Sequence, residues 1–348
     1  MIELDHYCAD TARATSMFAS LVRRAAAASA ASTASIAATS TPAAALLPND
    51  LFRGKVVFIT GGGSGINLGI AKTFAQLGAH ISICGRTAER LAGAKAELEA
   101  CRPDHVEGKS VVHTHTADVR DYDEVAAALA DAQATIGAPV HTLVCGAAGN
   151  FLAPAAKLSP NGFGTVVDID LNGTFNACRA AFEQLAAAAR ADPVAGLAAR
   201  DAGAAPSIIA ITAGQAYIPY AYQCHAGAAK AGVENLMKNL ANEWGPFGIR
   251  CNSVSPGPIT GTEGMSRLGP APGTPLYDEL TEAIPARRYG TVDEVANAAA
   301  FLASPLARYV TGSRLDVDGG MNLPGSGQFG SVLGKWGAEE AAKAAAEK

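Results

Sequence analysis

A glycine-rich segment that lies directly between a strand pattern and a helix pattern constrains the fold of this chain more than any other feature. The run VVFIT at 56–60 is apolar and rich in β-branched residues, and glycines follow at 61, 62, 63 and 65 before an amphipathic stretch. Gly61 fits a tight turn, while Gly65 lets the backbone approach a pyrophosphate group at the positive N-terminus of the helix. The segment therefore predicts a nucleotide-binding loop, although Asn67 stands where the last glycine of a dinucleotide fingerprint is usual.

Apolar, β-rich runs alternate with helical stretches from residue 51 to about residue 323. The runs lie at 56–60, 80–84, 111–119, 141–147, 207–213, 249–257 and 313–320, and helical patterns lie at 87–100, 121–136, 161–189 and 226–244. Apolar strands separated by helices of this length are typical of a parallel sheet with helices on both faces. We therefore predict an α/β fold, a single Rossmann-like doubly wound domain with about seven parallel strands.

The composition changes near residue 50, which marks the expected start of this domain. Residues 11–49 contain no Asp or Glu, and Ala, Ser and Thr surround three arginines. Such a stretch has too little large apolar surface to offset its ordering entropy, so we expect a disordered extension over 1–49. An acid-free tract of this kind is typical either of a mitochondrial transit peptide or of a dispensable tail, although residues 1–10 carry acids. The folded domain is expected over 50–325, with a surface loop at 190–206 and a polar tail at 326–348.

Charge and cysteine content exclude several classes of protein. The net charge of -5 gives no broad positive field for nucleic acid or an anionic membrane surface, and no apolar run reaches the roughly 18 residues that a membrane-spanning helix needs. Seven scattered cysteines without a Cys-x-x-Cys pair argue against a disulfide framework and a zinc site, so we expect a soluble protein of a reducing compartment. His113 and His115 have metal-like spacing, but no third ligand lies near them in the sequence, so no metal site is expected.

The end of the second strand indicates which dinucleotide is bound. An acidic residue there usually bonds a ribose 2′-hydroxyl, whereas this chain has Arg86 and no acid before Glu89. Because a guanidinium group matches a phosphate, Arg86 favours NADPH over NADH, although the same side chain would also cap the next helix or pair with Glu89. Asp118, at the end of the third strand, is placed either to bind the adenine amino group or to cap the helix that follows.

Several segments together resemble the short-chain dehydrogenase/reductase superfamily over residues 51–323. They are the glycine loop at 60–65, Asp118, the AAG at 147–149, Asn172 in LNGTF, Lys230 and the PGPI at 256–259. The superfamily usually carries Tyr-x-x-x-Lys and an upstream Ser or Thr, but this chain has Ala226 and Ala213 at those positions. The phenol and the hydroxyl that polarise a carbonyl are therefore missing, which disfavours ordinary alcohol–ketone chemistry.

Further segments resemble the 2,4-dienoyl-CoA reductases, and among them the peroxisomal-type branch. They are CGAAGNF at 145–151, VVDIDLNGTFN at 166–176, HAGAAKAGVENL at 225–236 and GPITGTEGMSRL at 257–268. Mitochondrial-type enzymes place a tyrosine where this chain has Gln215, whereas the peroxisomal-type branch has an aspartate that matches Asp170. Cys145, where relatives often have Asn, is a smaller departure.

The resemblance implies a reaction that needs no tyrosine. A 2,4-dienoyl thioester accepts hydride from NADPH at its δ-carbon, and charge moves through the conjugated system onto the thioester oxygen. Asn172 is the candidate donor to that oxygen, while a water held by Asp170 and Lys230 would protonate the α-carbon and yield a 3-enoyl-CoA. Lys230 would also hold the nicotinamide ribose. The alternatives are a solvated Lys230 and an Asp170 that, like Asp168, caps a helix.

The remaining site predictions follow from the same resemblance and from position along the chain. The cofactor is expected to contact Gly61, Gly62, Gly63, Ser64, Gly65, Ile66, Arg86, Asp118, Ala147, Lys230, Pro256, Gly257, Ile259 and Thr262. Substrate candidates are Arg120 and Arg267 for the phosphates of coenzyme A, Phe151 for the acyl chain, and Ser159 and Asn161 for the pantetheine. Each of these five has an ordinary alternative as a surface, core or helix-capping residue. The Gly- and Pro-rich stretch at 258–285 is expected to form a mobile lid.

The leading hypothesis is an NADPH-dependent reductase of 2,4-dienoyl-CoA esters, an auxiliary enzyme in the β-oxidation of unsaturated fatty acids. The alternatives are a reductase of 2-enoyl-CoA or of another conjugated carbonyl compound, and a non-catalytic NADP(H)-binding protein suggested by Ala213 and Ala226. The resemblance implies a homo-oligomer, either a tetramer or a dimer. For the location, the N-terminal tract favours the mitochondrion and the branch favours the peroxisome, although the chain does not end in Ser-Lys-Leu.

Overall fold

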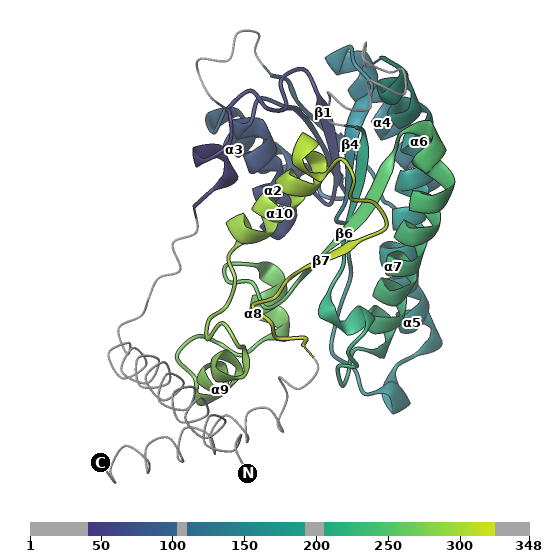
Figure 1. Ribbon diagram of the computed structural model, residues 1–348. Coiled ribbons are helices and arrows are strands. Elements are labelled where there is room, and N and C mark those ends of the chain that lie inside the picture. The colour runs from purple at the N-terminus through teal and green to yellow at the C-terminus, as the bar shows by residue number, and fades with distance from the viewer. Residues whose placement is uncertain (1–40, 103–109, 192–204, 324–348) are drawn as a thin grey trace, which may run out of the picture. The chain divides into compact units, whose positions relative to one another are not determined.

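Parallel strands form a seven-stranded sheet in the order β3-β2-β1-β4-β5-β6-β7 (Figure 1). They are β1 (Val56–Thr60), β2 (His80–Gly85), β3 (Val112–Thr116), β4 (Val140–Cys145), β5 (Ser207–Ile211), β6 (Arg250–Pro256) and β7 (Arg314–Val317). Every neighbouring pair runs parallel, which confirms the predicted fold class. The chain adds β2 and β3 on one side of β1 and then returns to place β4 on the other side. In doubly wound sheets, such a reversal opens a crevice at the carboxyl ends of the strands.

Helices cover both faces of the sheet (Figure 1). On one face lie α2 (Gly65–Gln76), α3 (Ala88–Ala100) and α10 (Val292–Ala303), and on the other lie α4 (Tyr122–Ile136), α6 (Gly173–Ala191) and α7 (Cys224–Trp244). Side chains alternate along each strand, so Val57 and Ile59 enter the first core while Val56 and Phe58 enter the second. Because both faces of the sheet are buried, the strands are continuous apolar runs in the sequence.

The computed structural model describes residues 41–102, 110–191 and 205–323. The expectations for residues 1–40, for most of the loop at 190–206 and for the tail at 326–348 lie outside this part of the chain. No helix in the described part is long and apolar enough to cross a membrane. Short 3₁₀ turns lie at Ala43–Ala45, Ala155–Lys157, Gly214–Ala216, Gly245–Phe247 and Pro305–Ala307.

Residues 41–52 pack onto the domain ahead of the expected boundary at residue 50. The backbone N–H of Ala43 donates to Asn297 Oδ1 (2.6 Å), and Asn297 Nδ2 donates to the carbonyl oxygen of Thr41 (2.9 Å). Ala43 is buried in the first core, and Phe52 is fully buried edge-on against Phe74, with ring centroids 4.9 Å apart. The expected disorder of 1–49 therefore does not extend to this stretch, because its apolar side chains have a partner surface on α2 and α10.

The helix expected over 161–189 is divided by a π-helical turn. The chain forms α5 (Pro160–Val167), the π-turn η3 (Asp168–Asn172) and then α6. A π-turn accommodates an extra residue in the helix, so side chains that follow it face a different direction from those in a regular helix. In this turn Asp170 is buried, whereas Asp168 and Asn172 are exposed.

The stretch expected to form a lid contains two short helices. They are α8 (Glu263–Leu268) and α9 (Pro275–Ala283), with a Gly- and Pro-rich segment between them. Helix α10 follows and was not predicted from the sequence. Its signal is a capping box, in which Thr291 Oγ1 accepts from the N–H of Glu294 and the Glu294 carboxylate accepts from the N–H of Thr291.

Four buried cysteines lie in the second core: Cys84, Cys145, Cys178 and Cys251. Burial raises the pKa of the Cys84 and Cys251 thiols to about 12. The sulfur atoms of Cys145 and Cys178 are 3.8 Å apart, within hydrogen-bond distance, and form no disulfide. In contrast, Cys224 is exposed at the start of α7.

Candidate functional site

A cavity of about 750 Å³ lies at the carboxyl ends of the strands. Its lining comes from the loops that follow strands β1 to β6, and from η3 and α7. The loops after β1 and β4 meet in its wall, because these two strands are neighbours at the point where the strand order reverses. This is where a doubly wound sheet is expected to bind a dinucleotide.

The glycine loop is fixed against the loop after β4 by direct hydrogen bonds. Thr60 Oγ1 accepts from the backbone N–H groups of Gly146 (3.1 Å) and Ala147 (3.2 Å). Asn67 Nδ2 donates to the carbonyl oxygens of Gly146 (2.8 Å) and Gly61 (3.3 Å). Asn67 therefore bridges the two loops, which explains why an amide replaces the usual last glycine.

Two glycines of the loop are required for different reasons. Gly61 has a φ of +68°, and a Cβ there would lie 2.9 Å from the Cα of Ala147. At Gly62 a Cβ would lie 2.5 Å from the side chain of Ile83 on β2. Gly61 thus permits the close approach of the two loops, whereas Gly62 permits packing inside the domain.

Most of the predicted cofactor contacts line the cavity. Those that do are Gly61, Gly63, Ser64, Gly65, Ile66, Arg86, Asp118, Ala147, Lys230, Pro256, Gly257, Ile259 and Thr262. Gly62 is the exception, since its Cβ position faces Ile83 on β2 rather than the cavity. Gly65 has a φ of +57° and open space at its Cβ position, which leaves room for a phosphate beside the N-terminus of α2.

Asp118, which lines the cavity after β3, is paired with Arg120. Arg120 Nη2 lies 2.6 Å from Asp118 Oδ2, and Arg120 Nε donates to Asp118 Oδ1 at 3.0 Å. These bonds lower the pKa of Asp118, and the nearby charge of Arg86 lowers it further. The alternative role of Asp118 as a helix cap belongs instead to Asp121, which accepts from the first N–H groups of α4. Arg120 does not line the cavity, so its side chain serves Asp118.

A buried ion pair joins α7 to the π-turn in the cavity wall. Lys230 Nζ lies 3.1 Å from Asp170 Oδ2 and donates to the carbonyl oxygen of Ile211 at 3.0 Å. Asp170 Oδ1 accepts from the backbone N–H of Gly149 at 2.7 Å. The two side chains are only 9% and 1% exposed, so each charge depends on the other and on these backbone bonds to offset its desolvation.

The hydroxyl groups of ordinary carbonyl reduction are missing around this pair. Ala226, one turn before Lys230 on α7, and Ala213, after β5, both line the cavity. A different tyrosine, Tyr220, also lines it and donates to Asn322 Oδ1 at 2.5 Å. Burial raises the pKa of the Tyr220 phenol.

Asn172 does not lie in the cavity. It is exposed at the end of the π-turn, and its Nδ2 donates to Asp168 Oδ1 at 2.8 Å. The role that the resemblance implied for its amide, stabilising the thioester oxygen, does not fit this position. The extra residue of the π-turn directs Asp170 inward and Asn172 outward.

A cluster of amides that was not predicted from the sequence lies in the cavity wall. Asn150 Nδ2 donates to Gln223 Oε1 at 2.6 Å, and Gln215 Nε2 donates to the same oxygen at 3.2 Å. Asn150 Oδ1 is buried and accepts no bond from the described residues. These three residues lie after β4, within η4 and directly before α7, so only the fold brings them together. The position of Asn150 directly after the AAG segment was the available signal.

Of the predicted substrate contacts, only Arg267 lines the cavity. Phe151 is 40% exposed and packs on His225, with ring centroids 4.4 Å apart. Ser159 caps α5 by accepting from the N–H of Gly162, and Asn161 is exposed on the same helix. For Ser159 and Asn161, the alternative role as helix-terminal residues therefore fits the structure.

A carboxylate on α8 bridges two arginines of the cavity lining. Glu263 lies 3.3 Å from Arg90 Nη1 on α3 and 3.4 Å from Arg267 Nη1 within α8. All three side chains are about half or more exposed. The pair Glu263–Arg90 connects the predicted lid to the helix that follows Arg86.

Comparisons with known proteins identify the family of this chain. The family model described as enoyl-(acyl carrier protein) reductase matches residues 61–322. The chain is 43% identical over 277 residues to the peroxisomal 2,4-dienoyl-CoA reductase [(3E)-enoyl-CoA-producing] of Rattus norvegicus, covering 79% of this chain and 87% of the relative.

Solved structures share the fold. A short chain dehydrogenase from Bacillus anthracis is similar with a TM-score of 0.64 and 34% identity, covering 78% of this chain and 97% of the other. A gluconate 5-dehydrogenase from Burkholderia cenocepacia, solved in complex with NADP and tartrate, has a TM-score of 0.67 and 29% identity, covering 79% and 98%. As its motifs predicted, the chain belongs to the short-chain dehydrogenase/reductase superfamily and, within it, to the family of the 2,4-dienoyl-CoA reductases.

Proposed function

We propose that the protein is an oxidoreductase that uses NADPH to reduce 2,4-dienoyl-CoA esters to 3-enoyl-CoA esters, an auxiliary step in the β-oxidation of unsaturated fatty acids. The observation that carries this proposal is the buried Lys230–Asp170 pair in a cavity wall where Ala213 and Ala226 replace the usual hydroxyl residues. The name of the rat relative supports the substrate class and the product.

The cavity fits a nicotinamide dinucleotide with a 2′-phosphate. The glycine loop leaves space at Gly65 beside the N-terminus of α2, where a pyrophosphate is favoured. The lining residues after β2 are Gly85, Arg86, Thr87, Arg90 and Leu91, of which two are arginines and none is acidic. Arg86 is therefore assigned to the 2′-phosphate, and Asp118 to the adenine.

When bound, NADPH supplies the hydride that reduces the δ-carbon of the dienoyl thioester. Lys230 positions the nicotinamide ring next to that carbon. Its ammonium group has three N–H donors, of which Ile211 and Asp170 take two. The third donor remains for a ribose hydroxyl or for a water. The lysine therefore orients the nicotinamide ring while it keeps its ion pair with Asp170.

Charge that develops on the thioester oxygen needs a donor other than Asn172. Gln223 uses its Oε1 to accept from Asn150 and Gln215, so its own amide N–H groups remain to donate to that oxygen. The proton for the α-carbon comes from a water bonded to the Asp170–Lys230 pair. The O–H bond breaks as the C–H bond forms, and the hydroxide that remains takes a proton from the Lys230 ammonium group, which solvent then reprotonates. Backbone bonds from Gly149 and to Ile211 keep both side chains in place, so the water is held at a fixed position.

The test is NADPH oxidation by the purified full-length chain with a medium-chain trans-2,4-dienoyl-CoA, beside the matching trans-2-enoyl-CoA. We expect turnover of the dienoyl ester alone, and the product to carry its double bond at C3. Comparable turnover of the 2-enoyl ester would assign the protein to the reductases of simpler conjugated esters. NADPH binding without turnover of either ester would make it a binding protein.

We further propose that the protein acts in the peroxisome, as the name of the rat relative indicates for that enzyme, and that it is a homo-oligomer. A fluorescent fusion of the full chain should colocalise with a peroxisomal marker, whereas mitochondrial fluorescence would support the transit-peptide interpretation of the N-terminal tract. Light scattering of the purified chain should give twice or four times the mass of 35.3 kDa.

A further inference from the structure

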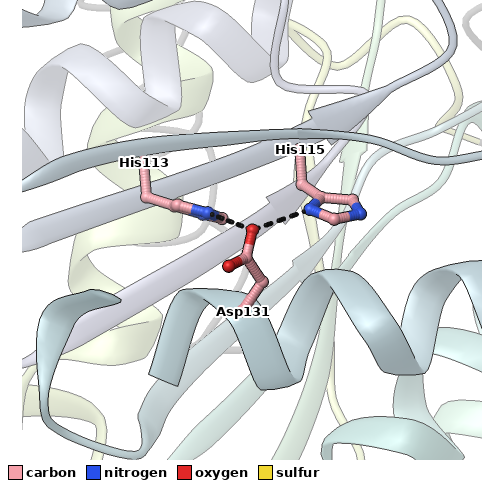
Figure 2. Close-up of side chains that lie close together, drawn as sticks. All are labelled: His113, His115 and Asp131. Carbon is pink, nitrogen blue, oxygen red and sulfur yellow. Dashed lines mark hydrogen bonds and ion pairs between the residues drawn. The ribbon is translucent and has the colours of Figure 1, made fainter. Parts of the chain in front are cut away.

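A cluster of two histidines and one aspartate lies outside the cavity, where β3 meets α4 (Figure 2). His113 and His115 are two residues apart on β3, so their side chains project from the same face of the sheet. Helix α4 covers that face and supplies Asp131, which points between the two rings (Figure 2). No metal was expected here, because no third ligand lies near the two histidines in the sequence; the fold provides one from α4.

The three side chains converge on a small volume. Asp131 Oδ2 lies 3.0 Å from His113 Nε2 and 2.9 Å from His115 Nδ1. All three ligand atoms lie within 4.8 Å of one another. Zinc–nitrogen and zinc–oxygen bonds of about 2.0–2.2 Å separate neighbouring ligand atoms of a tetrahedral ion by a little over 3 Å, so only small side-chain rotations are needed.

The cluster has a closed side and an open side. The His113 side chain is 8% exposed, that of His115 is 30% exposed and that of Asp131 is 50% exposed. An ion held here would therefore be fixed from the protein side by His113, while solvent completes its coordination from the other side.

A buried hydroxyl orients the inner histidine. His113 Nδ1 lies 2.9 Å from Ser82 Oγ on β2, and Ser82 is fully buried. A hydroxyl group both donates and accepts, so Ser82 Oγ can accept a hydrogen bond from His113 Nδ1–H. In that tautomer the lone pair of Nε2 is free to bind a metal ion. Metal-bound histidines commonly have such a partner on the second ring nitrogen.

We propose that His113, His115 and Asp131 form a binding site for a divalent transition-metal ion of the zinc class, separate from the reductase cavity. Two imidazoles and one carboxylate are ligands that suit Zn²⁺, whereas Mg²⁺ and Ca²⁺ prefer an all-oxygen set. The bound ion ties β3, an edge strand whose neighbour in the sheet is β2, to the middle of α4. It acts on stability, because an ion that binds only the folded chain favours that state by mass action.

The test uses the full-length, untagged chain after treatment with a chelator, titrated with Co²⁺ and with Zn²⁺. We expect a cobalt d–d absorption without the charge-transfer band of a thiolate ligand, and a rise in melting temperature with Zn²⁺. Both signals should be lost in His115→Ala and in Asp131→Asn. Both should persist in Asp123→Asn, which changes an exposed acid on the same helix, and in Cys224→Ser, which removes an exposed thiol.

These variants distinguish a metal site from a simple hydrogen-bonded cluster. His115 and Asp131 are the more exposed members, so their substitution keeps the chain folded, and NADPH-dependent turnover of the dienoyl ester should remain that of the unchanged protein. No cobalt absorption, or an absorption that survives in both ligand variants, would overturn the proposal. Failure of the reductase assay leaves this test unaffected, since it rests on metal binding and melting temperature.

Discussion

Asp170 and Lys230 face each other in a wall that excludes most of the solvent, and the proposed chemistry depends on this pair. Removing one partner of a buried pair leaves an uncompensated charge, at a cost of about 3–5 kcal/mol. The backbone bonds of Gly149 and Ile211 reduce the freedom of both side chains further. The pair is thus both a structural contact and the proposed holder of the reacting water.

Replacing Asp170 with Asn should lower the turnover of the dienoyl ester roughly 10²- to 10⁴-fold, because the proton-delivering water loses the carboxylate that holds it beside Lys230. The amide oxygen still accepts from the N–H of Gly149, so NADPH binding should persist in a fluorescence titration. Asp168→Asn, which changes an exposed aspartate of the same π-turn, is the matched control and should retain its turnover. Equal turnover in both variants would contradict the role of Asp170.

Replacing Arg86 with Ala should weaken NADPH binding roughly 10- to 100-fold, because a hydrogen-bonded charge is worth about 1.5–3 kcal/mol. NADH binding should stay unchanged, since NADH has no 2′-phosphate. Dissociation constants for both cofactors provide the measurement, and Arg308→Ala, an exposed arginine outside the cavity lining, is the control. A parallel loss of NADH affinity would indicate that Arg86 supports the loop rather than the phosphate.

Residue-level prediction from the sequence succeeded where a side chain follows directly from the end of a strand or from a regular helix. Arg86 follows β2 and Asp118 lies two residues after β3, so their positions in the lining followed from the strand ends. Lys230, on the continuous helix α7, was expected there from the family resemblance. Asn172 was misplaced because a π-turn changes the direction of side chains without any signal in hydrophobic periodicity. The amides of Gln215 and Gln223 were missed because only tertiary structure brings them to Asn150.

At the scale of elements, α10 illustrates how a local signal fixes a helix that the periodic pattern alone did not reveal. Thr291 and Glu294 form a capping box, and Arg288 Nη2 lies 2.5 Å from Glu294 Oε1. The hydrogen bonds from Arg288 lower the pKa of Glu294 below its ordinary 4.5. Since the folded-state pKa is the lower one, this carboxylate stabilises the fold above pH 4.5, and its contribution disappears as the pH falls through the folded-state value.

Glu294→Gln should therefore reduce the free energy of unfolding at pH 7 by about 1 kcal/mol, in the range of cap substitutions. The difference from the unchanged protein should shrink at a pH well below 4.5, where both side chains are neutral. Urea unfolding at the two pH values gives the measurement, with the exposed Glu282→Gln as the control. A difference that is the same at both pH values would mean that shape rather than charge matters at this position.

Helix α8 offers a second prediction at this scale. Glu263 lies 3.3 Å from Arg90, which lines the cavity together with Arg86, the residue assigned to the cofactor phosphate. Glu263→Gln should tighten NADPH binding by up to about 5-fold, since an exposed ion pair is worth about 0.2–1 kcal/mol. Fluorescence titration with NADPH would measure this change in affinity, with Glu279→Gln, which alters an exposed acid on α9, as the control. Weaker binding would instead show that the Glu263–Arg90 contact holds α8 over the bound cofactor.

On the scale of the whole molecule, the alternation of strands and helices was enough to predict a seven-stranded parallel sheet, because both sheet faces are buried and crossovers between parallel strands need helices. The start of the packed chain was not predictable in the same way. Residues 41–49 are rich in Ala and Pro, and their composition does not reveal that α2 and α10 provide a surface for them.

A chain that begins at residue 50 should thus be less stable than one that begins at residue 41. The shorter chain loses the two hydrogen bonds to Asn297 and the burial of Ala43, for which we expect a decrease of roughly 2 kcal/mol in the free energy of unfolding. Denaturant unfolding of the two chains measures this difference, and both should keep the same dienoyl turnover. Equal stability would show that residues 41–49 contribute nothing to the fold.

The distribution of thiols has a practical consequence for chemical labelling. The cysteines of the second core are shielded from alkylating reagents as long as the chain is folded. Cys224, in contrast, is exposed, and its neighbour Gln223 lines the cavity. Of the cysteines that the structure describes, Cys224 should therefore be alkylated first under native conditions, and a dye attached there would sense whether the cavity is filled. The core cysteines would take up label only on unfolding, so the same chain can report ligand occupancy and loss of structure through two separate sets of sulfur atoms.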